Sequence, residues 1–285
     1  MKCSVCSNDS WNYLFEARDR MFGLPGKFGE YRCTRCGFVR LDPKPKDVKK
    51  YYPPQKYYSY SDKSNPSFFS WLRSFLIRHR VFSLVPAMPQ ASSGRILDVG
   101  CGSGDTLLLL KQVGWDVYGM DIDSSAVKVA KKRGLKNVST KRITGFPDNY
   151  FDVIRAYHVI EHLESPKEFL QNAQTKLKAG GKIIIGTPNV DSLVAKVFGS
   201  RWYNLDAPRH LFLFSPKTLS KIVKPKFSDI HISFHSAGGW VGSIQYLFGV
   251  DLINRQWLVM LFYPLEWILD RLGLGDVFVL RARKP

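Results

Sequence analysis

Acidic side chains are scarce in this 285-residue chain, and long apolar runs are missing. The chain has 24 Asp and Glu residues against 42 Lys and Arg, which gives a formal net charge of +18. Such a charge attracts nucleic acid, phosphorylated substrates or anionic lipid headgroups without choosing among them. No apolar run reaches the roughly 18 residues that span a bilayer. The longest candidate, residues 257–268, is interrupted by Pro264 and Glu266, which excludes a membrane-spanning helix there.

The chain also shows no secretory leader, internal repeat or low-complexity tract. Met1, Lys2 and Cys3 lead directly into polar residues, whereas a leader would place an apolar segment there. We therefore expect a cytoplasmic protein, with peripheral contact at a membrane surface as an alternative. A length of 285 residues with 45% hydrophobic content accommodates one full α/β domain and a small accessory module.

Cysteine is also sparse, yet four of the five cysteines form two ordered pairs. Cys3 and Cys6 form one Cys-x-x-Cys pair, and Cys33 and Cys36 form the other. Two such pairs, separated by a loop or hairpin, supply the four thiolates that tetrahedral zinc prefers. Residues 1–40 are therefore expected to form a zinc ribbon that binds Zn²⁺, with disulfides or free thiols as the alternative. Four thiolates leave no open coordination position, so the expected role of this ion is structural.

The residue that follows each cysteine pair differs between the two pairs. Gly37 follows the second pair and suits a tight turn in which backbone N–H groups point at thiolate sulfur. Ser7 stands at the same place after the first pair, which predicts a slightly poorer turn there.

A glycine-rich loop follows an apolar strand pattern. Residues 96–104 read Ile-Leu-Asp-Val-Gly-Cys-Gly-Ser-Gly, so Asp98 is followed by three glycines at alternate positions. Such glycines let bare backbone approach a ligand, because any Cβ would push the ligand away. The next expected strand ends at Asp121, whose carboxylate is placed to accept hydrogen bonds from ribose hydroxyls. The pattern departs from the dinucleotide fingerprint at its sixth position, where Asp105 stands.

These two segments resemble the first and second motifs of class I S-adenosylmethionine (SAM) methyltransferases. The resemblance implies an α/β, Rossmann-like fold with a mostly parallel seven-stranded sheet, into which the last strand inserts antiparallel. It also implies SAM as the cofactor. The cofactor contacts that it implies are Asp98, Gly100, Cys101, Gly102, Gly104, Asp121, Ile122, Tyr157 and His158.

One segment departs from many relatives of this family. After the third expected strand, residues 139–146 contain no acidic residue that would hydrogen-bond the adenine amino group. Thr140 or backbone groups are expected in its place, with Ile143 or Phe146 packing on the ring.

From residue 95 onward the pattern alternates between strands and helices, which is typical of a parallel sheet with crossover helices. Ser165, Pro166 and Glu168 predict a capped helix start, and Ser215 with Pro216 predicts another. The expected strands are 95–99, 116–120, 138–142, 151–156, 182–187, 228–233 and 277–283. The expected helices are 104–112, 124–133, 166–178 and 216–223.

The remaining segments complete the expected domain organisation. Residues 41–66 form a linker rich in proline and tyrosine, and residues 67–285 form the SAM-binding domain. Residues 67–85 predict a basic, aromatic amphipathic helix. Residues 236–275 form an aromatic insertion between the two closing strands, which we expect to fold into helices over the substrate mouth. Packing on the domain and contact with a membrane surface are the alternatives for both segments.

The segment after the fourth strand carries three chemically capable residues, His158, Glu161 and His162. With residues 151–154 before it, it resembles a motif of ubiquinone-type O-methyltransferases and sugar methyltransferases. A histidine with a pKa near 6.5 suits removal of a hydroxyl proton during methyl transfer. His162 is the expected base, with His158 and His210 as alternatives, and Glu161 orients a histidine or holds a metal ion. The metal role is the less favoured, because His158 stands where those relatives carry an acidic residue.

Residues 201–211 follow the fifth strand and contain the sequence Pro-Arg-His-Leu. This run resembles the substrate-side loop of the same broad family. We expect Arg209 to bind a phosphate or carboxylate with two parallel hydrogen bonds, or else to form a surface salt bridge. Trp202 and Tyr203 are the other expected substrate contacts.

Three hypotheses for the function follow. The first is methyl transfer to oxygen of a small-molecule, sugar, or glycan- or lipid-linked acceptor, which the basic surface predicts to be anionic. The whole layout resembles a bacterial and archaeal group that often acts in sugar, glycan or other secondary metabolite pathways. The second is an RNA methyltransferase that uses the zinc ribbon and the basic surface, although residues 156–158 lack the Asn/Asp-Pro-Pro-aromatic motif of base-modifying enzymes. The third is a non-catalytic binding module.

Overall fold

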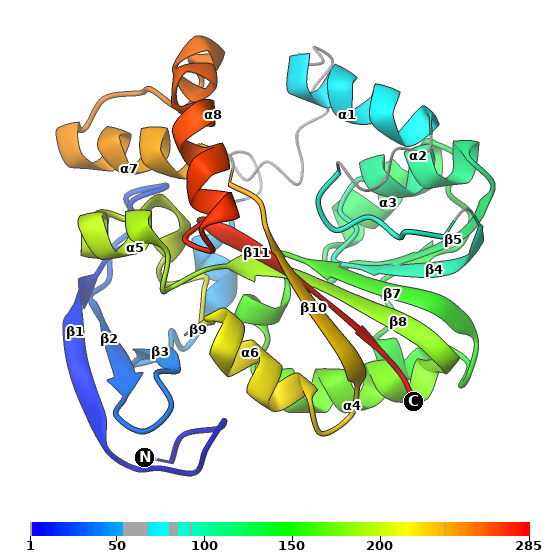
Figure 1. The fold of residues 1–285 in the computed structure, drawn as a ribbon, viewed down its shortest axis with the longest axis horizontal. Helices are drawn as coiled ribbons and strands as arrows, with labels where there is room; N and C mark the ends of the chain where they lie inside the picture. The colour runs from blue at the N-terminus through cyan, green and yellow to red at the C-terminus, as the bar shows by residue number, and fades with distance from the viewer. Residues whose placement is uncertain (1, 54–67, 80–84, 92, 237) are drawn as a thin grey trace.

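A seven-stranded sheet forms the centre of the molecule in the computed structural model, which describes residues 2–53, 68–79, 85–91, 93–236 and 238–285. The strand order is β10-β11-β8-β7-β4-β5-β6 (Figure 1). The strands are β4 (Gly94–Val99), β5 (Trp115–Met120), β6 (Val138–Ser139), β7 (Phe151–Tyr157), β8 (Leu177–Pro188), β10 (Ser228–Phe234) and β11 (Val277–Arg283). The strands from β4 to β8 run parallel, and β11 lies antiparallel between β8 and β10. The expected sheet, with its inserted last strand, is confirmed.

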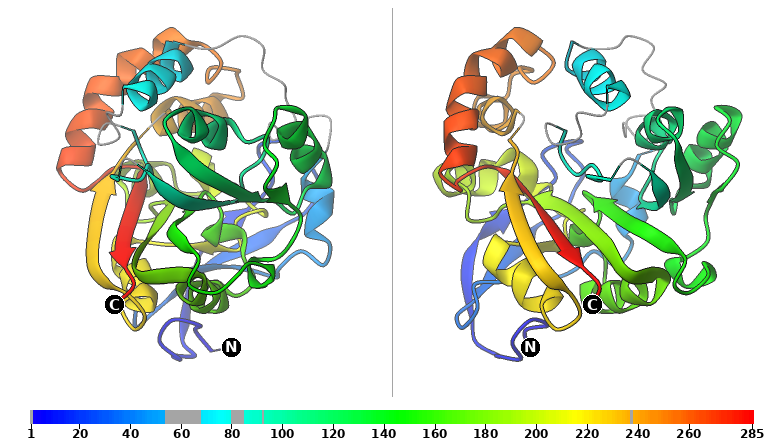
Figure 2. Two further views of the ribbon diagram at one scale, coloured as in Figure 1. Left: turned by 90° about the vertical axis from the view of Figure 1, so that its right-hand side faces the viewer. Right: turned by 45° about the vertical axis from the view of Figure 1, so that its right-hand side comes forward.

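Helices cover both faces of this sheet (Figures 1 and 2). Neighbouring strand residues face opposite cores, since Ile96 packs with side chains of α2 and α3 while Leu97 packs with those of α4 and α6. Burial on both faces explains why β4, β7 and β8 read as apolar runs. One face carries α1 (Phe68–Arg78), α2 (Asp105–Gln112) and α3 (Ser124–Lys132), and the other carries α4 (Pro166–Lys176) and α6 (Pro216–Val223).

The two expected helix starts differ in their capping. At α6 the Ser215 hydroxyl accepts from the Thr218 backbone N–H, and the Thr218 hydroxyl accepts from the Ser215 N–H at 2.8 Å. At α4 the Ser165 side chain makes no capping hydrogen bond, so the capping box expected with Glu168 is wrong. Both of these side chains are exposed, and water can satisfy the first-turn N–H groups there.

Two expected elements are shorter in the structure. Strand β6 ends at Ser139, not at residue 142, because it lies at the sheet edge and pairs with β5 over only two residues. A short 3₁₀ turn, η4 (Ile143–Gly145), follows it. Helix α1 ends at Arg78. Residues 67 and 80–84 of the expected amphipathic helix, and residues 54–66 of the expected linker, lie outside the described residues.

The N-terminal module contributes a second sheet, in the order β1-β2-β3-β9. Its strands are β1 (Trp11–Ala17), β2 (Phe28–Cys33), β3 (Val39–Asp42) and β9 (Phe212–Leu213). The fourth strand comes from the larger domain, and Val39 pairs with Leu213. The Phe38 ring stacks on the Phe212 ring at a centroid distance of 5.2 Å. The expected module of residues 1–40 is therefore joined to the larger domain by a shared sheet.

Residues 236–275 form two helices, α7 (Gly239–Phe248) and α8 (Gln256–Arg271). Both lie beyond the edge of the sheet where β8 ends and β11 begins (Figure 1). The short helix α5 (Leu193–Phe198) lies beneath them. Among the described residues, no helix is both long and apolar enough to cross a membrane.

Candidate active site

The glycine loop lies between the carboxyl end of β4 and the start of α2. Gly100, Gly102 and Gly104 have φ values of +69°, +53° and +84°, a region that side chains with a Cβ rarely adopt. A Cβ on Gly100 would also lie 2.5 Å from the Val159 side chain, and one on Gly104 would overlap Leu135. The backbone conformation therefore favours glycine at all three positions, and space also requires it at Gly100 and Gly104. Beside Gly102 there is open space, which a ligand can occupy.

Asp121 follows the end of β5 and reaches across to this loop. Its carboxylate accepts from the Gly102 N–H at 2.8 Å and from the Asp123 N–H at 2.9 Å. Burial raises the pKa of Asp121. Two of its four lone-pair positions remain for other donors. Ile122, next in the chain, is 93% exposed and offers an apolar surface beside the carboxylate.

Two other expected cofactor contacts are Asp98, at the end of β4, and Cys101, within the glycine loop. The Asp98 carboxylate accepts from Arg155 Nη1 at 2.7 Å, and both side chains are buried. Arg155 Nε also donates to the Ala87 carbonyl oxygen at 2.9 Å. Asp98 therefore anchors the strand end through Arg155. Burial raises the pKa of Cys101, which keeps its thiol protonated.

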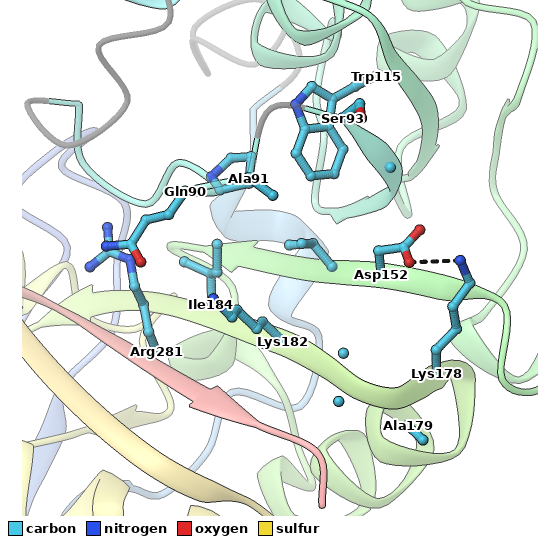
Figure 3. A pocket seen from close by; sticks show the side chains of 15 residues that line it. Gln90, Ala91, Ser93, Trp115, Asp152, Lys178, Ala179, Lys182, Ile184 and Arg281 are labelled. Atoms are coloured by element: carbon cyan, nitrogen blue, oxygen red, sulfur yellow. Dashed lines mark hydrogen bonds and ion pairs between the residues drawn. The ribbon is translucent and has the colours of Figure 1, made fainter.

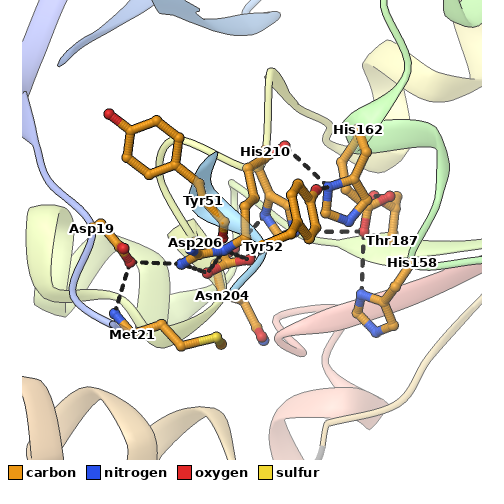
Figure 4. Close-up of polar contacts among 12 residues, drawn as sticks. Asp19, Met21, Tyr51, Tyr52, His158, His162, Thr187, Asn204, Asp206 and His210 are labelled. Atoms are coloured by element: carbon orange, nitrogen blue, oxygen red, sulfur yellow. Dashed lines mark hydrogen bonds and ion pairs between the residues drawn. The ribbon is translucent and has the colours of Figure 1, made fainter. Parts of the chain in front are cut away.

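His158, His162 and His210 lie close together beyond the carboxyl end of β7 and form a histidine cluster (Figure 4). The carboxylate of Glu161 lies near all three imidazoles. The side chain of Glu161 is fully buried. Its two carboxylate oxygens accept from His158 Nδ1 at 3.2 Å and from the Thr187 hydroxyl at 2.9 Å. Burial opposes its ionisation, but the hydrogen bond from His158 and the nearby imidazoles lower the pKa of Glu161 to about 2. The carboxylate is therefore ionised and can orient an imidazole.

His162 and His210 complete this cluster. The His162 Nδ1 lies 3.0 Å from the Arg209 carbonyl oxygen and 3.0 Å from the Tyr52 hydroxyl. The His210 Nδ1 lies 3.0 Å from the Asn204 carbonyl oxygen, and burial lowers the pKa of His210 to about 4. Ligand atoms of Glu161, His162 and His210 all lie within 4.8 Å of one another, so this set has the spacing of a metal site.

His158 differs from the other two histidines in its backbone, and from His210 in its exposure. Its φ is +54°, which is uncommon for a residue with a side chain and is often found at functional sites. Its side chain is 35% exposed, whereas that of His210 is buried. The Tyr157 ring lies edge-on to its imidazole, with centroids 4.5 Å apart. Of the three histidines, His158 combines a contact with Glu161 and access from solvent.

Arg209 is placed differently from the sequence expectation. Its guanidinium is fully buried and donates to Asp206, to Asp19 at 2.8 Å and to the Tyr51 carbonyl oxygen at 2.9 Å. These contacts raise its pKa above the ordinary value, against the effect of burial. The geometry leaves no exposed guanidinium edge for a substrate phosphate or carboxylate, which corrects that expectation. Sequence reasoning missed Asp19 because no local pattern links it to residue 209.

Trp202 and Tyr203, the other expected substrate contacts, are a buried and a partly buried side chain, respectively. Trp202 is buried and donates from Nε1 to Asp276 at 2.6 Å. The Tyr203 backbone N–H donates to the Ser243 hydroxyl at 3.0 Å. Its ring packs against Tyr246 of α7. These contacts with Asp276, Ser243 and Tyr246 hold the loop that carries His210 in place. Because Trp202 is buried, the expectation that it faces the substrate is corrected.

The four cysteines of the N-terminal module come together in space. Cys3 Sγ lies 3.6 Å from Cys36 Sγ, and Cys6 Sγ lies 3.6 Å from Cys33 Sγ. All four Sγ atoms lie within 4.8 Å of one another, and none is in a disulfide. The Cys3 thiol receives backbone N–H groups of Val5 and Cys6, and the Cys33 thiol receives those of Arg35 and Cys36.

A cavity of about 280 Å³ lies at the amino ends of β4 and β5, on the side of the sheet away from the glycine loop (Figure 3). It is lined by Gly94 and Trp115, where β4 and β5 begin, and by Asp152, which pairs with Lys178 at 2.6 Å. Ligands of open parallel sheets bind at the carboxyl ends of the strands. This cavity is therefore separate from the glycine loop and the histidine cluster.

Comparison with known proteins agrees with this arrangement. A family model described as a methyltransferase domain matches residues 72–225, which is more than half of the chain. The mitochondrial ubiquinone biosynthesis O-methyltransferase of Schizosaccharomyces pombe is 26% identical over 213 residues, which cover 68% of this chain and 70% of that enzyme. An uncharacterised protein of Methanocaldococcus jannaschii is 37% identical over 106 residues, 37% of this chain and 50% of that protein. The chain spans 42% to 61% of the length of several bacterial ubiquinone biosynthesis O-methyltransferases.

Solved structures share the same fold. The phosphoethanolamine N-methyltransferase 2 of Haemonchus contortus, in complex with SAM, superposes with a TM-score of 0.52 at 17% identity, covering 95% of this chain and 71% of that chain. The seven-stranded sheet, the open glycine loop beside Asp121 and the matched family model agree with one another. The chain therefore belongs to the methyltransferase domain family and is a class I SAM-dependent methyltransferase.

Proposed function

We propose that the protein transfers the methyl group of SAM to a hydroxyl oxygen of a small-molecule acceptor. In this proposal the backbone at Gly100, Gly102 and Gly104 lies against SAM, Asp121 binds the ribose hydroxyls, and Ile122 packs on the adenine. SAM supplies an electrophilic methyl group on sulfur, and its transfer to oxygen also needs a base for one proton. The open loop and the two remaining acceptor positions of Asp121 support this fit.

The observation that carries the proposal is the contact between the buried Glu161 carboxylate and the partly exposed His158 imidazole. An ionised carboxylate can only accept, so His158 Nδ1 carries a proton and its Nε2 lone pair is left as the base. A carboxylate that fixes the tautomer in this way also stabilises the imidazolium that forms. Nε2 takes the hydroxyl proton of the acceptor while the acceptor oxygen forms its bond to the methyl carbon and the carbon–sulfur bond breaks.

His162, the base expected from the sequence, remains the alternative. The Arg209 carbonyl oxygen can only accept, so it also fixes a proton on His162 Nδ1 and leaves Nε2 free to take a proton. A carbonyl contact does not stabilise an imidazolium as a carboxylate does, and for this reason we place His158 first. His210 is buried with a pKa lowered to about 4, which makes it a weak base.

The acceptor class rests on the relatives and on the sequence. The curated relative from Schizosaccharomyces pombe is named as an O-methyltransferase of ubiquinone biosynthesis, which favours a small molecule with a hydroxyl group. A sugar or a glycan- or lipid-linked anionic acceptor stays a prediction from the net charge of +18. An RNA acceptor is the second candidate on the same charge, and no contact among the described residues singles it out.

We also propose that Cys3, Cys6, Cys33 and Cys36 bind a structural Zn²⁺. Two sulfurs of a tetrahedral zinc site lie about 3.8 Å apart when each Zn–S bond is about 2.3 Å. The two 3.6 Å separations are close to this value and far longer than a disulfide bond of about 2 Å. Metal analysis should find zinc bound to the wild type and lost in Cys36→Ser; a metal-free, folded wild type would contradict the assignment.

Incubation with labelled SAM and three groups of acceptors, namely phenols, sugars and RNA, tests the proposed reaction. We expect label in a phenol or a sugar, and none in RNA, with the initial rate of His158→Ala at least about 100-fold below the wild type. The matched variant His162→Ala should retain more activity, and both should still bind S-adenosylhomocysteine by calorimetry. Transfer only to RNA would refute the small-molecule acceptor. A rate that rises with added Mg²⁺ and loses this response in His162→Ala would assign the cluster to a metal instead.

A further inference from the structure

Helix α8 turns an apolar face away from the protein. Eleven of the 17 large apolar side chains that are exposed in the described residues fall within residues 247–272. Trp257 and Leu261 are 61% and 66% exposed. Side chains three and four positions apart share one face of a helix, so these residues form a continuous stripe. The α8 stripe consists of Trp257, Met260, Leu261, Leu265, Ile268 and Leu272.

The acidic side chains of this helix point the other way. Glu266 is buried and accepts from the Gly238 N–H at 3.1 Å, and Asp270 accepts from the Ser236 hydroxyl at 2.7 Å. Arg271, at the end of the helix, lies over the Trp267 ring at 4.7 Å. The outer face of α8 therefore combines apolar and aromatic side chains with a cation, while both acids of the helix face the protein.

This arrangement is concentrated at one end of the molecule. Phe248, at the end of α7, is 69% exposed, and Trp71 and Phe75 of α1 are exposed as well. Helices α1, α7 and α8 lie at the same end in all three views (Figures 1 and 2). Outside α1 and residues 247–272, the described residues expose four large apolar side chains, each in a different segment of the chain: Tyr13, Ile122, Val197 and Ile232. Single exposed apolar side chains are ordinary for a protein surface.

We propose that the α8 stripe, together with the exposed end of α7, binds the surface of a bilayer that contains anionic lipid. Helix α8 has 16 residues, a length of about 24 Å, which is too short to span a bilayer but fits a helix lying in its surface. Trp and Arg side chains suit the headgroup level. A net charge of +18 favours anionic headgroups.

A second copy of this chain is the less suitable occupant of this face. Two copies meeting through α8 would bring two chains of net charge +18 together and place Arg271 and the exposed Arg255 of both at one interface, which like-charge repulsion opposes. Anionic lipid neutralises the same charges. One acidic side chain of the adjoining loop, Asp251, is exposed and bonded to Asn254, so the charge of this end stays positive.

Vesicle flotation of the full chain tests this inference independently of its enzymatic activity. Phosphatidylcholine vesicles with and without phosphatidylglycerol are the two probes. The stripe variant replaces Trp257, Leu261 and Ile268 by Ser. The control variant replaces the exposed Tyr13 and Val197 by Ser. Since all of these side chains are exposed, both variants should fold, which S-adenosylhomocysteine binding and circular dichroism verify.

We expect the wild type and the control to float with phosphatidylglycerol vesicles, and the stripe variant to bind them about 100-fold more weakly. Arg255→Gln with Arg271→Gln should reduce the preference for phosphatidylglycerol. The inference is overturned if the wild type floats with neither vesicle, or if the stripe variant floats as well as the control. It is also overturned if light scattering finds a wild-type dimer that the stripe substitutions convert to a monomer, since α8 would then bind a second copy.

Discussion

Replacing Glu161 by Gln tests the electrostatics at the centre of the candidate active site. Burial alone would raise the pKa of this carboxyl, but the hydrogen bond from His158 and the nearby imidazoles lower it from 4.5 to about 2. A shift of this size corresponds to about 3 kcal/mol of preferential stabilisation of the ionised form in the folded state. Glu161→Gln keeps the shape and an oxygen acceptor but removes the charge. We expect it to lower the free energy of unfolding by about 3 kcal/mol near neutral pH.

The pH dependence of this loss gives the sharper test. Because the folded-state pKa is depressed, the stabilisation is present above pH 4.5 and disappears as the pH falls toward 2. Guanidinium unfolding at several pH values should therefore show a difference between wild type and Glu161→Gln that shrinks on acidification. Glu164→Gln, at an exposed neighbouring position, is the matched control and should change stability by less than about 0.5 kcal/mol. The reasoning would be refuted if the wild type and Glu161→Gln were equally stable near neutral pH, or if the difference in their stabilities did not change with pH.

Four further substitutions follow from the structure. Ser7 has a φ of +62°, so Ser7→Gly should stabilise the N-terminal module by roughly 1 kcal/mol in thermal unfolding; a lower stability would show that its side chain matters more than its backbone. Asp121→Ala should weaken S-adenosylhomocysteine binding in calorimetry by at least about tenfold, while Asp116→Asn, at an exposed position on the strand that precedes Asp121, should not. Arg209→Met leaves the carboxylates of Asp19 and Asp206 without their cation and should lower the free energy of unfolding in denaturant by about 3–5 kcal/mol. An altered KM at unchanged stability would instead support a role of Arg209 in substrate binding. Glu30 is buried without a hydrogen-bond partner among the described residues, and burial raises its pKa. Stability should therefore fall as pH rises above the ordinary pKa of the carboxyl, and Glu30→Met should remove this fall and add about 1–3 kcal/mol near neutral pH; an unchanged pH profile would contradict this.

Elements with strong local signals could be predicted from the sequence. Helix α6 and strand β11 have the bounds that the pattern predicts, because Ser215 and Pro216 mark a helix start and the last strand is a compact apolar run. The loop, Asp121 and the histidines gather as expected, since the carboxyl ends of parallel strands share one edge of the sheet. The cysteine spacing likewise predicts the cluster that the structure brings together.

Contacts between distant segments could not be predicted in the same way. Strand β9 has two residues, too few to carry an alternating pattern, and its pairing with β3 is set by the tertiary fold. Tyr52 reaches His162 from 110 positions away, and Asp276 accepts from Trp202 across 74 positions. An arginine in a Pro-Arg-His-Leu run has the same local sequence whether it faces a substrate or two aspartates of the protein, so the sequence alone cannot decide between these partners of Arg209.

These distant contacts connect the N-terminal module to the histidine cluster of the candidate active site. Asp19 holds Arg209, whose carbonyl oxygen fixes His162, and Tyr52 bonds the same imidazole. Strand β9, which the module binds as its fourth strand, directly follows the loop that carries His210. The module therefore supports the histidine cluster through Asp19, and loss of its fold would disturb the backbone contact that Arg209 makes with His162. The Tyr52 hydroxyl comes from the segment that follows the module. On this argument the N-terminal module acts on the proposed methyl transfer through its contacts with residues 201–211, namely Asp19 with Arg209 and β3 with the adjoining β9.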